Sequence, residues 1–236
     1  MNGDETRKKT VRHYITNKIE IDCVIFNLDN HSLKILLVKE VDTAGKINWR
    51  LANDCIKEGE TIEGTAHTIL KKYTDDNHYF IEQLKAFGYS SRTSLQENIA
   101  IAYYALVKRD QSVLEDAPVN ENIKWIGINE IADLNDKDKV ILDFSLKELR
   151  KNSCQSTVAF NLLPEKFTLL QVVHLYEEIL GIAINKSNFR RKIFQMGLVK
   201  DSNEKEENVS HRAAKYYSLS SQDHEMLRYR ELNFNF

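Results

Sequence analysis

Four side chains in the C-terminal part of the chain have the types and spacing needed to recognise DNA bases. Asn188, Arg191, Lys192 and Gln195 occupy positions i, i+3, i+4 and i+7, which a helix turning about 100° per residue places on one face. Arg and Lys recognise guanine in the major groove, while Asn and Gln can bind adenine through two hydrogen bonds. The alternative is an ordinary solvent-exposed helix face, since polar faces of this kind are common.

The local charge supports an interaction with nucleic acid. Between Ile179 and Lys200 the chain has five basic residues and no acidic residue, although its formal net charge is −2. A net charge near zero does not exclude DNA binding when basic residues are concentrated on one element. We expect phosphate contacts from the start of the helix and a minor-groove contact from the hairpin that follows. The predicted DNA-binding residues are Lys186, Ser187, Asn188, Arg191, Lys192, Gln195 and Arg212.

The elements expected around these side chains are two helices and a hairpin. Thr168 and Gln171 have capping-box spacing, and Gly181 is a typical helix terminator. Asn185 can begin a second helix that runs to Met196, with its apolar side packed on the first helix. Two short strands separated by a polar loop follow. Helix, turn, helix and hairpin in this order predict a winged helix-turn-helix domain.

The preceding part of the chain has the pattern of a mixed α/β domain. The expected strands are 19–26, 34–39, 80–89, 99–107 and 123–128, and the expected helices are 61–73 and 137–150. The polar stretch from Lys151 to Ser156 is expected to be a linker. The predicted fold class is therefore α+β, with an N-terminal αβα sandwich in residues 1–153 and a C-terminal winged helix-turn-helix in residues 154–236.

Composition narrows the possible classes of protein. The 236 residues include 29% charged and 42% hydrophobic residues, as in ordinary globular proteins. The three cysteines are widely spaced and the histidines are scattered, so we expect neither a disulfide framework nor a zinc site. The sequence has no secretory signal and no apolar run long enough to cross a bilayer. We therefore expect a cytoplasmic protein with no membrane partner.

Residues 51–75 resemble a Nudix box, the motif in which helix carboxylates hold Mg²⁺ or Mn²⁺ against a diphosphate. In that frame Glu60 is retained, but Ile69, Lys72 and Tyr73 stand where the box has carboxylates. Hard cations need several oxygen ligands, so we expect no catalytic residues, no metal and no cofactor. The remote alternative is a hydrolase whose ligands are displaced to Glu58 and Glu63 beside Glu60.

A second resemblance covers most of the chain. Residues 160–169, 175–181, 188–192 and 211–217 are similar to the C-terminal domain of Nudix-related transcriptional regulators of the NrtR/AraR type. Residues 22–26, 36–39, 102–105 and Trp49 are similar to the N-terminal domain of that family. There are two departures: Ala213 replaces a usual Pro, and Ala52-Asn53-Asp54 replaces Pro-Gly-Gly. The resemblance implies a Nudix-like domain that senses a small molecule and a winged helix that binds an operator as a dimer.

Loss of the metal carboxylates removes one means of holding a diphosphate, so we expect a sugar effector. Sugar sites combine polar groups that form paired hydrogen bonds with an aromatic face. For any single candidate, an ordinary surface or core role is the more common interpretation, since binding sites use few polar groups. The candidate effector-binding residues are Lys39, Glu40, Arg50, Asn53, Asp54, Tyr89, Arg92 and Tyr103.

These observations predict a cytoplasmic, homodimeric transcriptional repressor of sugar utilisation, such as arabinose use. Two recognition helices would enter successive major grooves of a palindromic double-stranded operator. The first alternative is a regulator of nucleotide or NAD metabolism that senses ADP-ribose. The second is a protein that binds an effector or a partner without binding DNA.

Overall fold

The computed structural model describes residues 18–29, 31–74, 79–90, 97–108, 120–131, 134–206 and 213–220. The N-terminal part contains β1 (Ile19–Asp29), β2 (Ser32–Val41), β3 (Ile47–Cys55), α1 (Ile62–Tyr73), β4 (Tyr79–Ser90), β5 (Glu97–Val107), β6 (Ile123–Gly127) and α3 (Asp136–Gln155). The C-terminal part contains η1 (Val158–Leu162), β7 (Phe167–Thr168), α4 (Leu169–Leu180), α5 (Lys186–Gln195), β8 (Val199–Lys205) and β9 (Lys215–Leu219).

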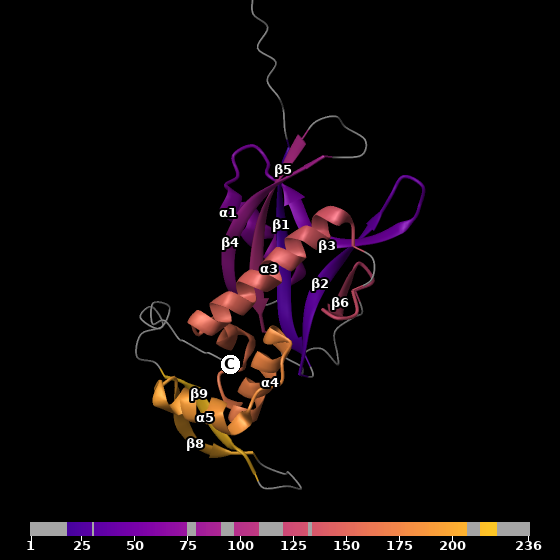
Figure 1. Cartoon of the computed structure of the whole chain (residues 1–236). Helices are drawn as coiled ribbons and strands as arrows, with labels where there is room; N and C mark the ends of the chain where they lie inside the picture. The colour runs from indigo at the N-terminus through magenta and orange to yellow at the C-terminus, as the bar shows by residue number, and fades with distance from the viewer. Residues whose placement is uncertain are drawn as a thin grey trace, which may run out of the picture.

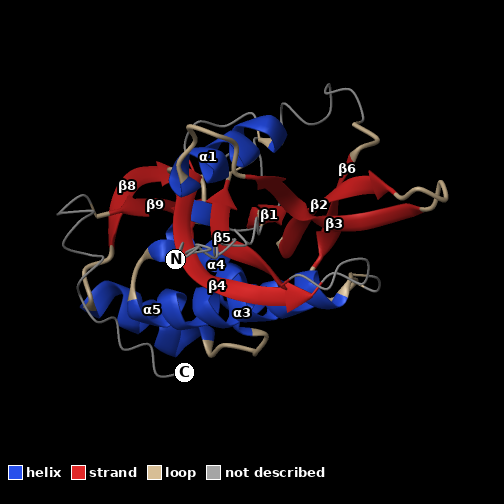
Figure 2. Ribbon diagram, turned by 90° about the horizontal axis from the view of Figure 1, so that it is seen from above, coloured by secondary structure: helices blue, strands red, loops and turns tan. Residues whose placement is uncertain are grey.

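Strands β1 to β6 form one sheet in the order β4-β5-β1-β3-β2-β6. β1 and β5 are parallel, and the other pairs are antiparallel. Helix α1 covers one face of the sheet, and α3 and α4 lie on the other (Figures 1 and 2). β1 is apolar along most of its length because both of its faces are buried: Cys23 packs toward α1 and Val24 toward α3. The predicted α+β class with an αβα sandwich is confirmed.

The winged helix unit has the predicted local structure. The Thr168 hydroxyl accepts a hydrogen bond from the Gln171 amide at 3.2 Å, and the Gln171 side chain accepts one from the Thr168 amide at 2.7 Å. Gly181 ends α4 with a φ of 69°, a left-handed conformation that favours glycine. β8 and β9 form the predicted hairpin, and β7 adds a third strand to it. The capping box and both helices are confirmed.

One hydrophobic core joins the two units. It extends from Val24 and Phe26 in the sheet, through Leu149 of α3, to Tyr176 of α4 and Ile193 of α5. Tyr176 and Ile193 are fully buried. Because interiors pack at nearly crystalline density, a shared core fixes the position of α4 relative to the sheet.

The prediction of a linker from Lys151 to Ser156 is wrong, because most of this stretch is helical. α3 continues to Gln155, and Ser153 is fully buried. The predicted domain boundary after residue 153 therefore falls in the last turn of α3, and the boundary itself stays a prediction. β3 lies outside the predicted strands. The predicted hairpin loop begins at residue 201, whereas β8 extends to Lys205.

Candidate DNA-binding face and effector-binding residues

The orientation of α5 follows from its caps and its apolar side. The Asn185 side chain accepts a hydrogen bond from the Asn188 amide at 3.0 Å, which begins the helix, and Gly197 follows its end with a φ of 64°. Phe189 and Ile193 are buried, and the Phe189 ring lies 5.2 Å from the Tyr176 ring of α4. The opposite side of α5 therefore faces solvent.

Most of the predicted DNA-binding residues lie on that solvent side. The exposed members are Lys186, Ser187, Asn188, Arg191 and Gln195, whereas Lys192 is half-buried and Arg212 lies outside the described residues. Helical spacing places Arg191 almost opposite the buried Ile193, so Arg191 marks the centre of the exposed arc. The sequence analysis omitted Arg190 and Phe194, which are also exposed. The Phe194 ring contacts Tyr217 of the hairpin edge-on at 5.6 Å.

Polar contacts tie the first helix of this unit to the sheet. The Glu178 carboxylate of α4 accepts a hydrogen bond from the Leu33 amide at the start of β2, at 3.0 Å. The Arg150 guanidinium of α3 donates to the Ile179 carbonyl at 2.8 Å. α4 supports α5, so these contacts connect the sheet mechanically to the candidate DNA-binding helix.

A cluster of charged side chains lies where the first turn of α3 meets the sheet. The Lys137 ammonium is 2.8 and 2.9 Å from the two Asp22 carboxylate oxygens and 3.0 Å from Glu20. The Arg50 guanidinium is 3.1 Å from Glu20 and 3.0 Å from Glu40. These contacts neutralise both cations with carboxylates of the chain itself.

Carboxylates outnumber cations in this cluster, because the fully buried Asp138 also belongs to it and accepts a hydrogen bond from the Leu51 amide at 3.1 Å. Burial raises the pKa of Asp22 to about 6, and the neighbouring Glu20 and Asp138 carboxylates oppose the attraction of Lys137. Burial acts on Glu20 in the same direction, but Lys137 and a hydrogen bond from Tyr89 outweigh it and lower the pKa of Glu20. Closely spaced carboxylates beside an aromatic ring can bind the hydroxyl groups of a sugar or ribose.

The structure does not bring all of the predicted effector-binding residues together. Glu40, Arg50 and Tyr89 belong to the charged cluster. Tyr103 packs in the core beneath α1 instead, and its hydroxyl donates to the Gln83 side chain at 2.8 Å. Lys39 and Asn53 are half-buried outside the cluster, and the Asp54 carboxylate is 3.4 Å from the Lys57 ammonium. Arg92 lies outside the described residues.

The sequence analysis missed Glu20, Asp22, Lys137 and Asp138. A signal for the first two is present in β1: two acidic residues separated by one position share a face of an otherwise apolar strand. Buried charges require partners, so this pattern alone indicates that cations lie opposite. The identity of those cations is visible only in the folded chain.

The Nudix-like helix does not fit a divalent cation. Ile69 is 2% exposed and packs in the core, so an apolar side chain stands at the position of a box carboxylate. Glu60 accepts hydrogen bonds from the Thr65 hydroxyl and the Lys57 amide, at 3.1 and 3.2 Å. Within the described ranges, no three Asp, Glu, His or Cys side chains form a metal-binding group. Of the box carboxylates that hold the cation in a Nudix hydrolase, Glu60 is retained, and the position of Ile69 offers no oxygen ligand.

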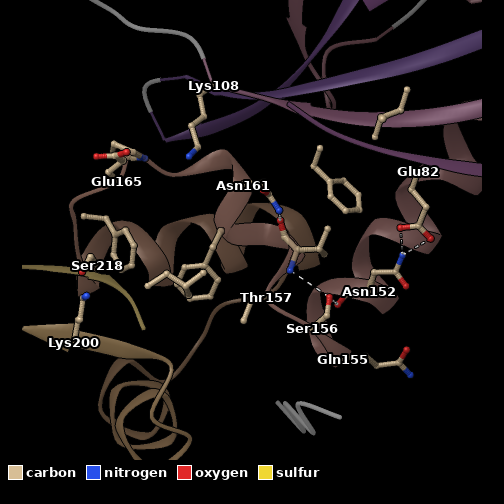
Figure 3. Close-up of a pocket in the computed structure, with 17 residues that line it drawn as sticks. Glu82, Lys108, Asn152, Gln155, Ser156, Thr157, Asn161, Glu165, Lys200 and Ser218 are labelled. Atoms are coloured by element: carbon tan, nitrogen blue, oxygen red, sulfur yellow. Dashed lines mark hydrogen bonds between the residues drawn. The ribbon is translucent and has the colours of Figure 1, made fainter. Parts of the chain in front are cut away.

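A cavity of about 930 Å³ lies at the junction of the sheet, α3 and the hairpin (Figure 3). Its lining includes Phe80 and Glu82 of β4, Asn152 of α3, and Lys200 and Ser218 of the hairpin. The lining contains neither a predicted effector-binding residue nor a member of the charged cluster.

Among the helices that the structure describes, none has the length and the apolar composition of a membrane-spanning segment.

Comparison with known proteins identifies the C-terminal unit. Residues 159–219 match the model of the NrtR DNA-binding winged helix domain. This match and the sandwich fold define the class of the protein: a Nudix-like domain followed by a DNA-binding winged helix domain.

The comparisons over the longer chain agree with this class. NrtR from Shewanella oneidensis in complex with a 27mer DNA is 26% identical and has a TM-score of 0.72, covering 86% of this chain and 93% of its own. A second structure of NrtR from the same organism is 27% identical and has a TM-score of 0.73, covering 86% of this chain and 94% of its own. The ADPR responsive transcriptional repressor NtrR of Acinetobacter baylyi is 23% identical over 90% of this chain and 86% of its own. Over most of its length the chain is therefore similar to Nudix-related transcriptional regulators of the NrtR type.

Proposed function

We propose that this chain is a transcriptional repressor that binds a palindromic operator as a homodimer and responds to ADP-ribose. The observation that carries the proposal is the similarity to the Acinetobacter baylyi repressor, which is described as ADPR responsive and aligns with 90% of this chain. The Shewanella oneidensis NrtR–DNA complex, with a TM-score of 0.72, supports DNA binding. The proposed place of action is the cytoplasm, where the operator DNA lies.

The comparisons favour ADP-ribose over the sugar effector that the sequence analysis expects. ADP-ribose contains ribose hydroxyls as well as a diphosphate, so the charged cluster retains a role. Glu20 and Glu40 have carboxylate oxygens that can accept hydrogen bonds from ribose. The Tyr89 ring lies beside them, with the Lys137 ammonium 5.0 Å from its centre.

The proposed DNA-binding residues remain those of α5, with Arg191 at the centre of the exposed arc. Arg191 is suited to guanine and Gln195 to adenine. Lys186 and Ser187 lie in the first turn, where the helix N-terminus also favours a phosphate. Arg212 stays a prediction.

The test is a DNA-binding titration with and without candidate effectors. An operator would first be enriched from random DNA with the full chain, and its affinity measured by fluorescence anisotropy at fixed salt concentration. We expect ADP-ribose to change the operator affinity, whereas arabinose and ribose leave it unchanged. A change with arabinose alone would restore the sugar hypothesis, and turnover of ADP-ribose with Mg²⁺ would indicate a hydrolase.

Two variants separate the parts of the proposal. Arg191→Ala should weaken operator binding, relax the base preference at one position and leave ADP-ribose binding intact. Lys147→Ala is a matched control, because Lys147 is an exposed cation on α3 rather than on α5. Equal operator affinity of Arg191→Ala and the wild type would contradict the assignment of α5 as the recognition helix.

A further inference from the structure

Phe194 is a large aromatic side chain on the solvent side of α5, with 48% of its surface exposed. It follows Arg191 by three positions and Ser187 by seven, so helical spacing places the three side chains on one face. That face is the exposed arc of which Arg191 marks the centre. An apolar ring therefore lies among the polar and basic side chains that the proposed function assigns to DNA.

The hairpin holds the Phe194 ring in place. The ring contacts Tyr217 of β9 edge-on, with 5.6 Å between the ring centres and 64° between the ring planes. Tyr217 is half-buried, packs against the core and pairs with Phe167 in the sheet of the winged helix unit. Edge-on aromatic pairs are stabilising beyond the area that they bury. Phe194 is therefore positioned by two elements, while about half of its surface stays open to solvent.

The short length of α5 allows both of its ends to reach DNA bases. Its 10 residues span about 15 Å, whereas the major groove is about 12 Å wide. Phe194 lies about 4.5 Å along the helix axis from Arg191, which is little more than one base-pair step of about 3.4 Å. The two side chains can therefore contact neighbouring base pairs when the exposed arc faces the groove.

A phenyl ring offers no hydrogen bond to a base edge, but it can recognise a methyl group. Among the four bases, thymine presents a methyl group in the major groove, at C5, and apolar side chains such as Phe contact it there. Bringing the ring and the methyl group together removes apolar surface from water, which is favourable. The chemistry of Phe194 therefore fits thymine.

We propose that Phe194 is a specificity-determining residue that selects a thymine within about two base pairs of the base contacted by Arg191. The assignment rests on the proposed function, because it requires α5 to be the recognition helix. Arg191 and Gln195 recognise hydrogen-bonding groups of the bases, whereas Phe194 adds a contact that depends on apolar surface alone.

The test is a thermodynamic cycle between Phe194 and the methyl groups of the operator. Each thymine of the enriched operator, together with its symmetry-related copy, would be replaced in turn by uracil, which lacks only that methyl group. Fluorescence anisotropy at fixed salt concentration gives the affinities of the full chain. One replacement should weaken wild-type binding by about fourfold per half-site, the contribution of one buried methyl group. The same replacement should leave the affinity of Phe194→Ala unchanged.

Two further variants make the cycle specific. Ile182→Ala is the matched control, because Ile182 is also 48% exposed but lies in the turn before α5. This variant should respond to uracil as the wild type does. Phe194→Gln keeps a long side chain with good helix propensity, and it should lose the response as Phe194→Ala does. Circular dichroism and thermal unfolding verify that the variants are folded.

Two results overturn the role of Phe194 while operator binding is intact. One is a wild type whose affinity changes with no thymine replacement. The other is a loss with uracil that is as large in the Phe194 variants as in the wild type, which means that the ring only braces the hairpin. A wild type that binds no DNA selectively refutes the proposed function, and the role of Phe194 with it.

Discussion

The buried carboxyl of Asp22 is expected to make the stability of the protein depend on pH in an unusual direction. Asp22 is fully buried on β1, where burial raises its pKa from 3.8 to about 6. The folded chain therefore holds this proton more tightly than the unfolded chain does. The resulting stabilisation is complete below pH 4 and is lost as the pH rises through 6.

The magnitude follows from the two pKa values. A rise from 3.8 to about 6 corresponds to roughly 3 kcal/mol when the pH is below both values. At pH 5 only part of the effect is present, roughly 1 kcal/mol, and at pH 7.5 almost none remains. Asp22→Asn cannot take up the proton, so the stability of the wild type relative to this variant should increase by roughly 1 kcal/mol between pH 7.5 and 5.

The assay is urea unfolding of both proteins at pH 7.5, 6 and 5, with ADP-ribose absent. Histidine titration affects wild type and variant alike, and it cancels in the difference between them. Asp143→Asn is the matched control on the exposed face of α3. A difference between wild type and Asp22→Asn that stays constant with pH, or that shrinks toward pH 5, would refute the buried, proton-binding role of Asp22.

Three further predictions concern the winged helix unit and its attachment. Arg191→Ala should weaken operator binding by about 1–3 kcal/mol and relax the base preference at one position. Lys186→Ala should weaken binding to all DNA sequences alike and reduce the slope of log affinity against log salt concentration by about one. Operator titrations at several salt concentrations measure both, and equal effects of the two variants would contradict the assigned roles. Gly181→Ala should lower the free energy of unfolding by about 1 kcal/mol, because the φ of 69° is unfavourable for alanine. The added Cβ would cause no clash, since it meets only Arg150 at an ordinary 3.8 Å. An unchanged urea midpoint would contradict this prediction. Glu178→Ala removes the acceptor of the Leu33 amide and should cost about 1–2 kcal/mol, and it should also reduce the effect of ADP-ribose on operator affinity. An unaltered response to ADP-ribose would show that this contact carries no coupling.

The sequence alone determined the local features of this protein. The capping pair of Thr168 and Gln171, the terminator Gly181 and the cap of α5 at Asn185 depend on neighbouring residues, so their patterns could be recognised without a fold. The loss of the box carboxylates is likewise visible in the sequence, and the structure adds that Ile69 is buried in the core.

The tertiary structure decided which polar residues share a site. Lys137 contacts Glu20 across 117 positions of the chain, and no local pattern connects them. The continuation of α3 through the polar stretch that was expected to be a linker also depends on distant residues, since packing buries Ser153. Caps and turns are fixed by contacts a few residues apart, whereas ion pairs and buried polar helices depend on how α3 and α4 pack on the sheet. That is why the two helices of the winged helix unit and their caps could be predicted from the sequence and the charged cluster at the start of α3 could not.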